Sequence, residues 1–348
     1  MSETGKADIL SLTRRELEER MEQAAQKRFR AKQVYEWLHV KHVRSFDQMT
    51  NLPKELRRTL SEQYRIPALE TVEVLTSQID GTQKYLFALE DGNVIESVLM
   101  RYSYGLSACI SSQVGCSMGC RFCASTIGGK VRDLGAGEMI AQITRMSEAA
   151  GERIGHVVIM GSGEPLDNYD NLVRFLKLMG DPDGECLSLR DITVSTCGIV
   201  PNIRRLAQEG LPVTLALSLH APSQEKRERL MPIAKKYPLA DVMDAMREYY
   251  ELTGRRITFE YSCVEGENTT FQDAEMLADL VRGMNCHINL IPVNQVPERA
   301  YRRPGRQAIE AFRRKLEKRG ISVTIRREMG RDINGACGQL RRSHIMPG

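Results

Sequence analysis

The stretch GCSMGCRFCAS, residues 115–125, holds Cys116, Cys120 and Cys123, separated by three residues and then by two. In a reducing compartment, cysteines this close together are more naturally metal ligands than disulfide partners. Their number is informative, because a structural zinc ion and a closed iron–sulfur cluster each take four protein ligands. Three thiolates can hold three corners of a [4Fe–4S] cluster and leave one iron open to a small molecule. The motif therefore predicts one reactive cluster.

A zinc site is the alternative interpretation of this loop. It would need a fourth ligand, and the nearest downstream histidine, His156, lies on an expected strand. The loop also has features that suit a cluster: Gly115 and Gly119 allow tight turns, and Phe122 can shield the metal from water. We therefore favour the iron–sulfur cluster.

From about residue 106, short β-branched runs alternate with longer amphipathic stretches. This alternation predicts parallel β/α units, in a full or partial barrel or in an open α/β sheet. The expected strands are SACISS, HVVIM, DITVS, VTLALSL, ITFEYSC, HINLIPV and SVTIRR, and the expected helices span 135–150, 168–179, 201–210, 239–253, 271–284 and 305–319.

The segment before the β/α units divides in two. Residues 1–67 show helical periodicity and predict a small helical N-terminal domain. Residues 68–105 contain β-rich runs punctuated by Asp80-Gly81 and Asp91-Gly92, which predict a β-hairpin extension. Residues 106–348 then form the core and end in a loop that contains Cys337.

Polar motifs follow the expected strands at the positions where parallel α/β folds place their chemistry. MGSGEP follows HVVI, STCG follows DITV, SLHAP follows VTLAL, and NQVP follows HINLIPV. GACGQL comes a few residues after the last strand. Packing alone does not explain this gathering, so we expect these motifs to form one site.

The composition fits a cytoplasmic protein. The 348 residues are 42% hydrophobic, which allows a sizeable core, and no stretch approaches the roughly 18 apolar residues of a membrane span. The start, MSETGKADIL, lacks the pattern of a secretory signal. The nine cysteines are therefore expected to be thiols, ligands or catalysts.

Several motifs together resemble one family. CISSQVGCSMGCRFCAS, MGSGEPLDN, STCGIVPNI, LALSLHAP, LMPI, NLIPVN and INGACGQL, in this order, resemble the RlmN branch of the RlmN/Cfr ribosomal RNA methyltransferases, within the radical S-adenosylmethionine (SAM) superfamily. The similarity covers nearly the whole chain. It implies an α/β fold, a partial (β/α)6 TIM-like radical SAM barrel. Asp133 departs from the expected Asn, and Ser162 replaces the methionine of many relatives.

The resemblance implies methylation at C2 of an adenine in the peptidyl transferase centre of 23S rRNA, and of an adenine in the tRNA anticodon loop. An aromatic C2–H is not a nucleophile, so radical chemistry is needed. Cys337 would first accept a methyl group from one SAM. A second SAM, cleaved at the cluster, would yield the radical that activates this methyl group. Cys109 would then release the RNA and leave a Cys109–Cys337 disulfide. Without the family, we would expect both cysteines to be buried and inert.

The resemblance also implies the remaining site residues. Glu96 corresponds to a proton acceptor, although a glutamate on a strand more often faces solvent. His220 invites a general-base interpretation, but we favour a cofactor contact. Cys186, Cys197, Cys263 and Cys286 are expected to be buried structural thiols. The expected SAM contacts are Gly163, Glu164, Ser195, Ser218, Leu219, His220 and Asn294.

RNA is the expected partner, and two basic segments could contact its phosphates. Residues 27–44 carry six Lys or Arg against one acidic residue, and the second segment spans residues 299–320. Either could equally be a solvated helix face. Tyr35 could stack on a base, whereas Trp37 is expected to lie in the core. We further expect a flavodoxin or ferredoxin as electron donor, and a monomer.

Three rival functions keep the same cysteine loop. A Cfr-type enzyme shares both catalytic cysteines and methylates C8 of adenine. A SAM-radical activase or sulfur-inserting enzyme would not need both Cys109 and Cys337. A zinc RNA-binding module would bind no iron. The flanking residues QVGCSMGC and GEPL favour the C2 methyltransferase.

Overall fold

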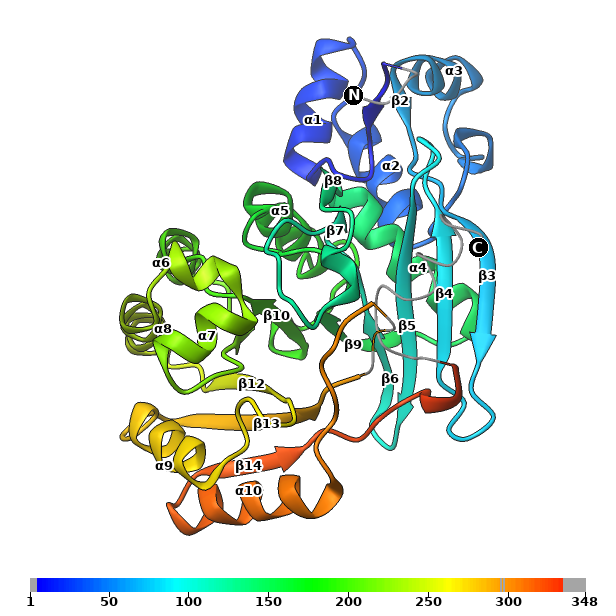
Figure 1. Cartoon of the computed structure of the whole chain (residues 1–348). Helices are drawn as coiled ribbons and strands as arrows, with labels where there is room; N and C mark the ends of the chain where they lie inside the picture. Colours follow the sequence, from blue (N-terminus) through cyan, green and yellow to red (C-terminus); the bar gives the residue numbers. More distant parts are fainter. Residues whose placement is uncertain (1–4, 295, 297, 334–348) are drawn as a thin grey trace.

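The computed structural model describes residues 5–294, 296 and 298–333, and its central feature is a ten-stranded sheet (Figure 1). The strand order is β14-β13-β12-β11-β10-β9-β6-β5-β4-β3, and the pairs from β6 to β14 are parallel. All the strands expected from the sequence after residue 106 are confirmed. The parallel strands are β6 (Gly105–Cys109), β9 (Ile154–Ile159), β10 (Ile192–Thr196), β11 (Thr214–Ser218), β12 (Ile257–Cys263), β13 (Cys286–Pro292) and β14 (Ser322–Ile325).

The order of these strands across the sheet is also their order along the chain. Each crossover therefore advances by one strand in the same direction, which places the connecting helices on one face and curls the sheet as in a barrel. In the described residues β14 ends the sheet at one edge, so this part is a partial barrel. The α/β fold class is thus confirmed.

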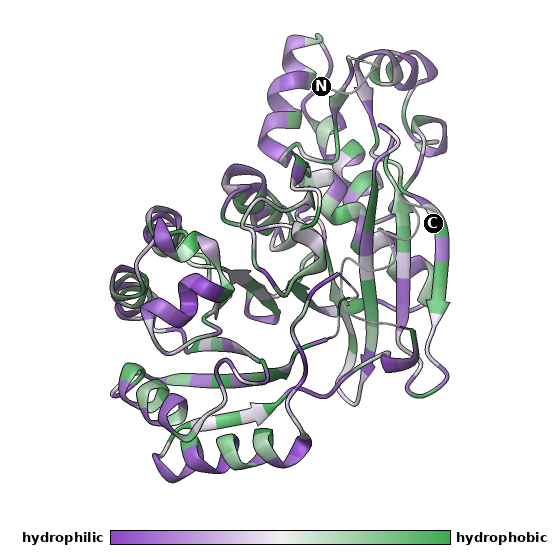
Figure 2. Cartoon of the chain, in the orientation of Figure 1, coloured by the Kyte–Doolittle hydropathy of each residue, from purple (hydrophilic) through white to green (hydrophobic). Residues whose placement is uncertain are grey.

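The helices of the β/α units correspond to the predicted ones, with α7 in addition. In Figure 2, hydrophobic residues run along the sheet, whereas α1 (Arg14–Gln23) near the N-terminus is mostly hydrophilic. The helices are α4 (Ala136–Ala150), α5 (Tyr169–Met179), α6 (Val200–Gln208), α7 (Gln224–Leu230), α8 (Leu239–Thr253), α9 (Phe271–Leu280) and α10 (Arg306–Lys318), with short 3-10 turns η2 (Ala124–Thr126), η3 (Leu189–Asp191), η4 (Pro232–Lys235) and η5 (Arg331–Ile333).

The two predicted hairpins are present. β3 (Glu70–Thr76), β4 (Gln83–Ala88) and β5 (Val94–Tyr102) pair antiparallel, and the connecting turns place Gly81 at φ 70° and Gly92 at φ 77°. β5 pairs antiparallel with β6, so the hairpins extend the same sheet. A separate two-stranded sheet, β7 (Gln113–Gly115) with β8 (Lys130–Asp133), flanks the cysteine loop.

The N-terminal region is helical, as the sequence predicts. Thr13 caps the first helix reciprocally with Glu16, which satisfies free backbone N–H groups there. The elements are β1 (Ala7–Asp8), α1 (Arg14–Gln23), α2 (Phe29–His39), η1 (Phe46–Gln48), α3 (Lys54–Gln63) and β2 (Tyr64–Arg65).

Polar contacts join this region to the first turn of α4. The backbone N–H of Gly137 donates to Ser11 Oγ at 2.8 Å, and Ser11 Oγ donates to Asp8 Oδ2 at 2.6 Å. A Cβ atom on Gly137 would lie 2.4 Å from Asp8 Oδ2. Glycine is therefore required here by close approach rather than by its backbone angles.

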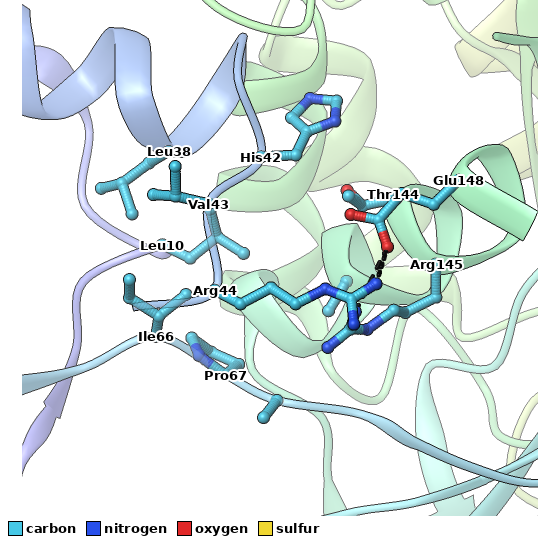
Figure 3. Close-up of a pocket in the computed structure, with 12 residues that line it drawn as sticks. Leu10, Leu38, His42, Val43, Arg44, Ile66, Pro67, Thr144, Arg145 and Glu148 are labelled. Atoms are coloured by element: carbon cyan, nitrogen blue, oxygen red, sulfur yellow. Dashed lines mark hydrogen bonds and ion pairs between the residues drawn. The ribbon is translucent and has the colours of Figure 1, made fainter. Parts of the chain in front are cut away.

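A small hollow of about 30 Å³ lies at the same junction (Figure 3). Arg44, from the loop after α2, and Arg145, from α4, both donate to the carboxylate of Glu148. Leu10, Leu38, Val43, Ile66 and Pro67 supply its apolar lining. The hollow belongs to the packing of the N-terminal region on α4.

No helix in the described part of the chain is long and apolar enough to span a membrane.

Replacing Gly137 with alanine should destabilise the protein, although alanine favours helices. The added methyl group must displace the Asp8 carboxylate, and such overpacking typically costs about 1–3 kcal/mol. Thermal unfolding followed by circular dichroism should show a lower Tm for Gly137→Ala. Gly155→Ala is the matched control, because its Cβ would meet nothing within 4 Å. Equal Tm values for the two variants would contradict this packing.

Candidate active site

One cavity of about 210 Å³ lies between the cysteine loop and the ends of the parallel strands. Residues from or just after β9, β10, β11, β12, β13 and β14 line it. The motifs MGSGEP, STCG and SLHAP thus meet at one site, as expected, whereas Asn294 of NQVP does not line the cavity and GACGQL lies outside the described residues. The lining consists of Cys116, Met118, Cys120, Phe122, Cys123, Ser125, Thr126, Ile159, Met160, Gly161, Gly163, Glu164, Ser195, Thr196, Cys197, Ser218, His220, Met231, Glu260, Ile291 and Arg326.

The cysteine loop is held by glycine turns and by hydrogen bonds from a side-chain hydroxyl to its backbone carbonyl groups. Gly115 has φ 77°, and a Cβ atom there would lie 2.0 Å from the carbonyl oxygen of Gly129. The hydroxyl of Thr126 donates to the carbonyl oxygens of Cys120 and Cys123, at 3.1 and 3.0 Å. These contacts fix the turn that carries all three thiols to the cavity.

Burial dominates the electrostatics of the three thiols. It raises the pKa of Cys116 to about 12, and it also raises the pKa values of Cys120 and Cys123. The thiols act on one another as well, because a charge on Cys123 would oppose ionisation of Cys120. Such thiols become thiolates when they bind a metal cation.

These residues fit an iron–sulfur cluster, because they are three, their ligand atoms are sulfur, and all three line the same cavity. Three soft sulfur donors converge on one cavity that has room for a small molecule beside them. Among the described residues, no three His, Cys, Asp or Glu side chains gather closely enough to hold a single metal ion. In a cluster each thiolate binds its own iron, so its ligands need not converge on one point.

Gly163 and Glu164 follow β9, and they contact β7 and the residue just after β10. A Cβ atom on Gly163, at φ 111°, would lie 2.7 Å from the backbone nitrogen of Gln113. The Glu164 carboxylate accepts the backbone N–H of Cys197 at 2.7 Å and that of Leu166 at 3.1 Å. Burial raises the pKa of Glu164, whereas these hydrogen bonds oppose the shift. A carboxylate oxygen with a remaining lone pair can still accept from an ammonium group.

His220 is neutral, and its protonated nitrogen can be assigned. The backbone N–H of Ser262 donates to Nδ1 at 2.9 Å, which leaves the ring proton on Nε2. Burial, and then the charge of Arg227, lowers the pKa of His220 to about 3. The residue has φ 56°, and the side-chain amide of Asn268 donates a hydrogen bond to its backbone carbonyl oxygen at 2.7 Å. The ring is therefore a hydrogen-bond donor at Nε2.

The other expected SAM contacts divide into two groups. Ser195 on β10 and Ser218 on β11 line the cavity, with their hydroxyl oxygens 3.4 Å apart. Leu219 is fully buried and Asn294 is exposed, and neither contributes to the lining.

Cys109 and Glu96 form a second group, buried beside the cavity rather than in it. Cys109 ends β6 and packs against Val98 and Met100. Glu96 on β5 is 1% exposed and forms an ion pair of 3.0 Å with the fully buried Lys84 on β4. The alternative interpretation, a glutamate that faces solvent, is therefore excluded by its burial. Cys337 lies outside the described residues.

Burial raises the pKa of Cys109, whereas the charge of Arg326 lowers it. Arg326 lines the cavity, as does Glu260 on β12, whose buried carboxylate accepts from Asn289 at 3.0 Å. The sequence analysis missed both residues. A single carboxylate within the apolar run ITFEYSC was the available signal for Glu260.

The structure corrects two further expectations. Tyr35 is 1% exposed, and its hydroxyl donates to Asp181 at 2.8 Å, so it cannot stack on a base without leaving the core. Cys186 is exposed and Cys286 half-buried, whereas Cys197 and Cys263 are buried as expected. Trp37 packs against the core as expected but is only half-buried, and Lys41 lies over its ring.

Comparisons with known proteins agree with this architecture. The model of the radical SAM superfamily matches residues 110–281, and that of the ribosomal RNA large subunit methyltransferase N-terminal domain matches residues 7–66. A probable dual-specificity RNA methyltransferase RlmN of Lachnospira eligens is 57% identical, over 97% of both chains. Its counterpart in Geobacillus kaustophilus is 53% identical, over 96% of this chain and 92% of its own. The crystal structure of a radical SAM methyltransferase from Sphaerobacter thermophilus matches with a TM-score of 0.91 and 42% identity, over 96% of this chain and 98% of that one.

The ring nitrogen signals of His220 should not shift between about pH 5 and 8, where an ordinary histidine titrates. Nuclear magnetic resonance of protein labelled with 15N-histidine should show Nε2 protonated throughout, and His220→Gln assigns the signal. His42 is an internal comparison: burial opposes its charging, but the contacts with Glu185 outweigh it and raise its pKa. A His220 signal that titrates near pH 6.5, about the ordinary value, would contradict the assignment.

Proposed function

The chain belongs to the RlmN family of dual-specificity RNA methyltransferases within the radical SAM superfamily, and we propose that it methylates C2 of adenine in RNA. The proposed substrates are adenine 2503 of 23S rRNA, in the peptidyl transferase centre, and adenine 37 of tRNA. The observation that carries the proposal is the cavity that joins the three thiols of the cysteine loop to the polar ends of the parallel strands.

In this proposal Cys116, Cys120 and Cys123 hold one [4Fe–4S] cluster, which supplies the electron that cleaves SAM. Gly163, Glu164, Ser195, Ser218 and His220 bind SAM in the cavity. The Glu164 carboxylate accepts from the ammonium group, and His220 donates from Nε2. Leu219 and Asn294 are further proposed contacts, although neither lines the cavity.

The remaining steps use the two cysteines and Glu96. Cys337 loses its proton and accepts a methyl group from one SAM, and a second SAM is consumed in activating that group. After the carbon adds to adenine, the adduct returns one electron to the one-electron couple that cleaved SAM, and Glu96 accepts the proton that leaves the ring. Cys109, as a thiolate, attacks the sulfur of Cys337. The bond from that sulfur to the new carbon breaks, the carbon keeps the electron pair and takes up a proton to become the methyl group, and a Cys109–Cys337 disulfide forms, which an external reductant returns to two thiols.

The surroundings of Glu96 support its role as an acceptor. A buried carboxylate without a counter-charge would be costly, and Lys84 supplies that charge at 3.0 Å. The hydroxyl of Ser111 donates to the carbonyl oxygen of Glu96 at 2.7 Å, which fixes the backbone that carries it. The pairing of Val98 with Cys109 in the sheet brings β5 and the resolving cysteine together.

We assign RNA recognition to the helical N-terminal domain, residues 1–67, with the hairpin extension at 68–105 and the radical SAM core at 106–348. Exposed Lys27, Lys32 and Lys41 are available for phosphates. Phe29 is 52% exposed and lies beside Arg30. Phe29 is therefore a better candidate for base stacking than the buried Tyr35. The target adenine must be unstacked to reach the core.

The alternative is the Cfr-type reaction, which uses the same cysteines and methylates C8. Product analysis separates the two. The enzyme, reconstituted anaerobically with iron and sulfide, is incubated with SAM, dithionite and unmodified 23S rRNA or tRNA. Nucleosides from the digested RNA are then compared with synthetic 2-methyl and 8-methyl adenosine. We expect the 2-methyl product, and an 8-methyl product would move the activity to the alternative.

Variants of the two cysteines test the mechanism in the same assay. Cys109→Ala should retain its iron but accumulate RNA covalently bound to protein, with product reduced at least about 100-fold, because the link is no longer resolved. Cys337→Ala should give neither product nor adduct. Cys186→Ala, at an exposed thiol remote from the cavity lining, is the control and should behave as the wild type. Product formation by either of the first two variants at the wild-type rate would contradict the mechanism.

A further inference from the structure

Arg227 is a buried cation behind the wall of the cavity. It lies in α7, and its side chain is 0% exposed. Nε donates to the carbonyl oxygen of Leu219 at 3.3 Å, and Nη2 donates to that of Cys197 at 2.6 Å. Nη1 is buried and has no hydrogen-bond partner among the described residues. The proposed mechanism gives this guanidinium no role.

No carboxylate in the described part of the chain forms an ion pair with Arg227, although an arginine stays charged in proteins. A buried cation without a counter-charge is strongly unfavourable. Burial lowers the pKa of Arg227, and negative charge on the thiols of Cys197 and Cys120 would oppose that shift. Cys120 is one of the three cysteines of the loop, so a bound metal would make it a thiolate beside this cation.

Helix α7 is also attached to the cysteine loop. The backbone N–H of Arg121 donates to the carbonyl oxygen of Leu230 at 2.9 Å. A Cβ atom on Gly119 would meet Pro232 at 3.7 Å. Arg227 lies about one turn before Leu230, and Met231, the next residue along, lines the cavity. The position of the guanidinium relative to the loop is therefore fixed by backbone contacts.

We propose that Arg227 is a positioning residue whose fixed charge favours the reduced state of the cluster held by Cys116, Cys120 and Cys123. The inference rests on the proposed cluster. Reduction adds one electron, taken from an external low-potential donor, and makes no bond and moves no proton. It makes the group formed by cluster and thiolates more negative by one charge, so a nearby buried cation stabilises the reduced form more than the oxidised form.

A purely structural role predicts something different. The contacts to Leu219 and Cys197 could serve only to join the ends of β10 and β11. A neutral side chain of similar length that keeps one of these hydrogen bonds would then leave the reduction potential unchanged. Arg227→Gln removes the charge and retains a donor, whereas Arg227→Lys retains the charge with a different shape.

The test is a redox titration of the anaerobically reconstituted protein, with the reduced cluster measured by electron paramagnetic resonance. At the midpoint of the wild type, Arg227→Gln should lower the ratio of reduced to oxidised cluster about tenfold, which corresponds to about 59 mV for one electron. Arg227→Lys should remain close to the wild type. Arg229→Gln is the matched control, because it removes a half-exposed charge from the same helix and should have no effect.

The outcomes are distinct. A wild-type midpoint retained in Arg227→Gln, with full iron content, overturns the inference and leaves the proposed function intact. A wild-type protein that binds no cluster overturns the proposed function itself. If Arg227→Gln folds but loses iron while Arg227→Lys keeps it, the bound cluster requires the positive charge at this position, and the inference is supported. Equal loss of iron in both variants would show that shape matters rather than charge, and the inference would fail.

Discussion

Desolvation of three thiols at one edge of a parallel sheet is the constraint on which the rest of the site depends. Cys116 is buried, Cys120 and Cys123 are half-buried, and burial raises the pKa of all three, so each thiol stays neutral until a cation binds. The loop that carries them can close only because Gly115 lies against Gly129 without a side chain. The cavity beside it exists because the crossovers all advance in one direction, which brings the ends of successive strands to the same mouth.

The buried charges around this cavity form two groups, and only one of them has a counter-charge among the described residues. Lys84 pairs with Glu96 on the antiparallel side of the sheet, where Cys109 ends β6. Arg227 lies on the parallel side, bonded to carbonyl oxygens and to no carboxylate of the described residues. One group is satisfied within the described protein, whereas the other has a free donor. The three thiols of the cysteine loop lie on the parallel side, and a cluster bound there would supply the negative charge that Arg227 lacks.

The sequence was sufficient for the strands, most of the helices and both hairpins, because β-branched runs, amphipathic periods and Asp-Gly turns are local signals. It missed α7, since QEKRERL is short and has only one hydrophobic residue. The burial of Tyr35 and the exposure of Cys186 depend on distant packing partners that no local pattern reveals. The cavity groups the expected cysteines with Glu164 and His220, but it also contains Glu260 and Arg326, which become neighbours only through the curl of the sheet.

The central claim is that three cysteines hold a cluster whose fourth iron is open to SAM. Mössbauer spectroscopy of protein reconstituted with 57Fe, recorded before and after addition of SAM, tests it most directly. The account predicts four irons per cluster, of which one changes its signal when SAM binds, and loss of the cluster in Cys120→Ala. Four equivalent irons that do not respond to SAM, or a protein that binds zinc in preference to iron, would contradict it.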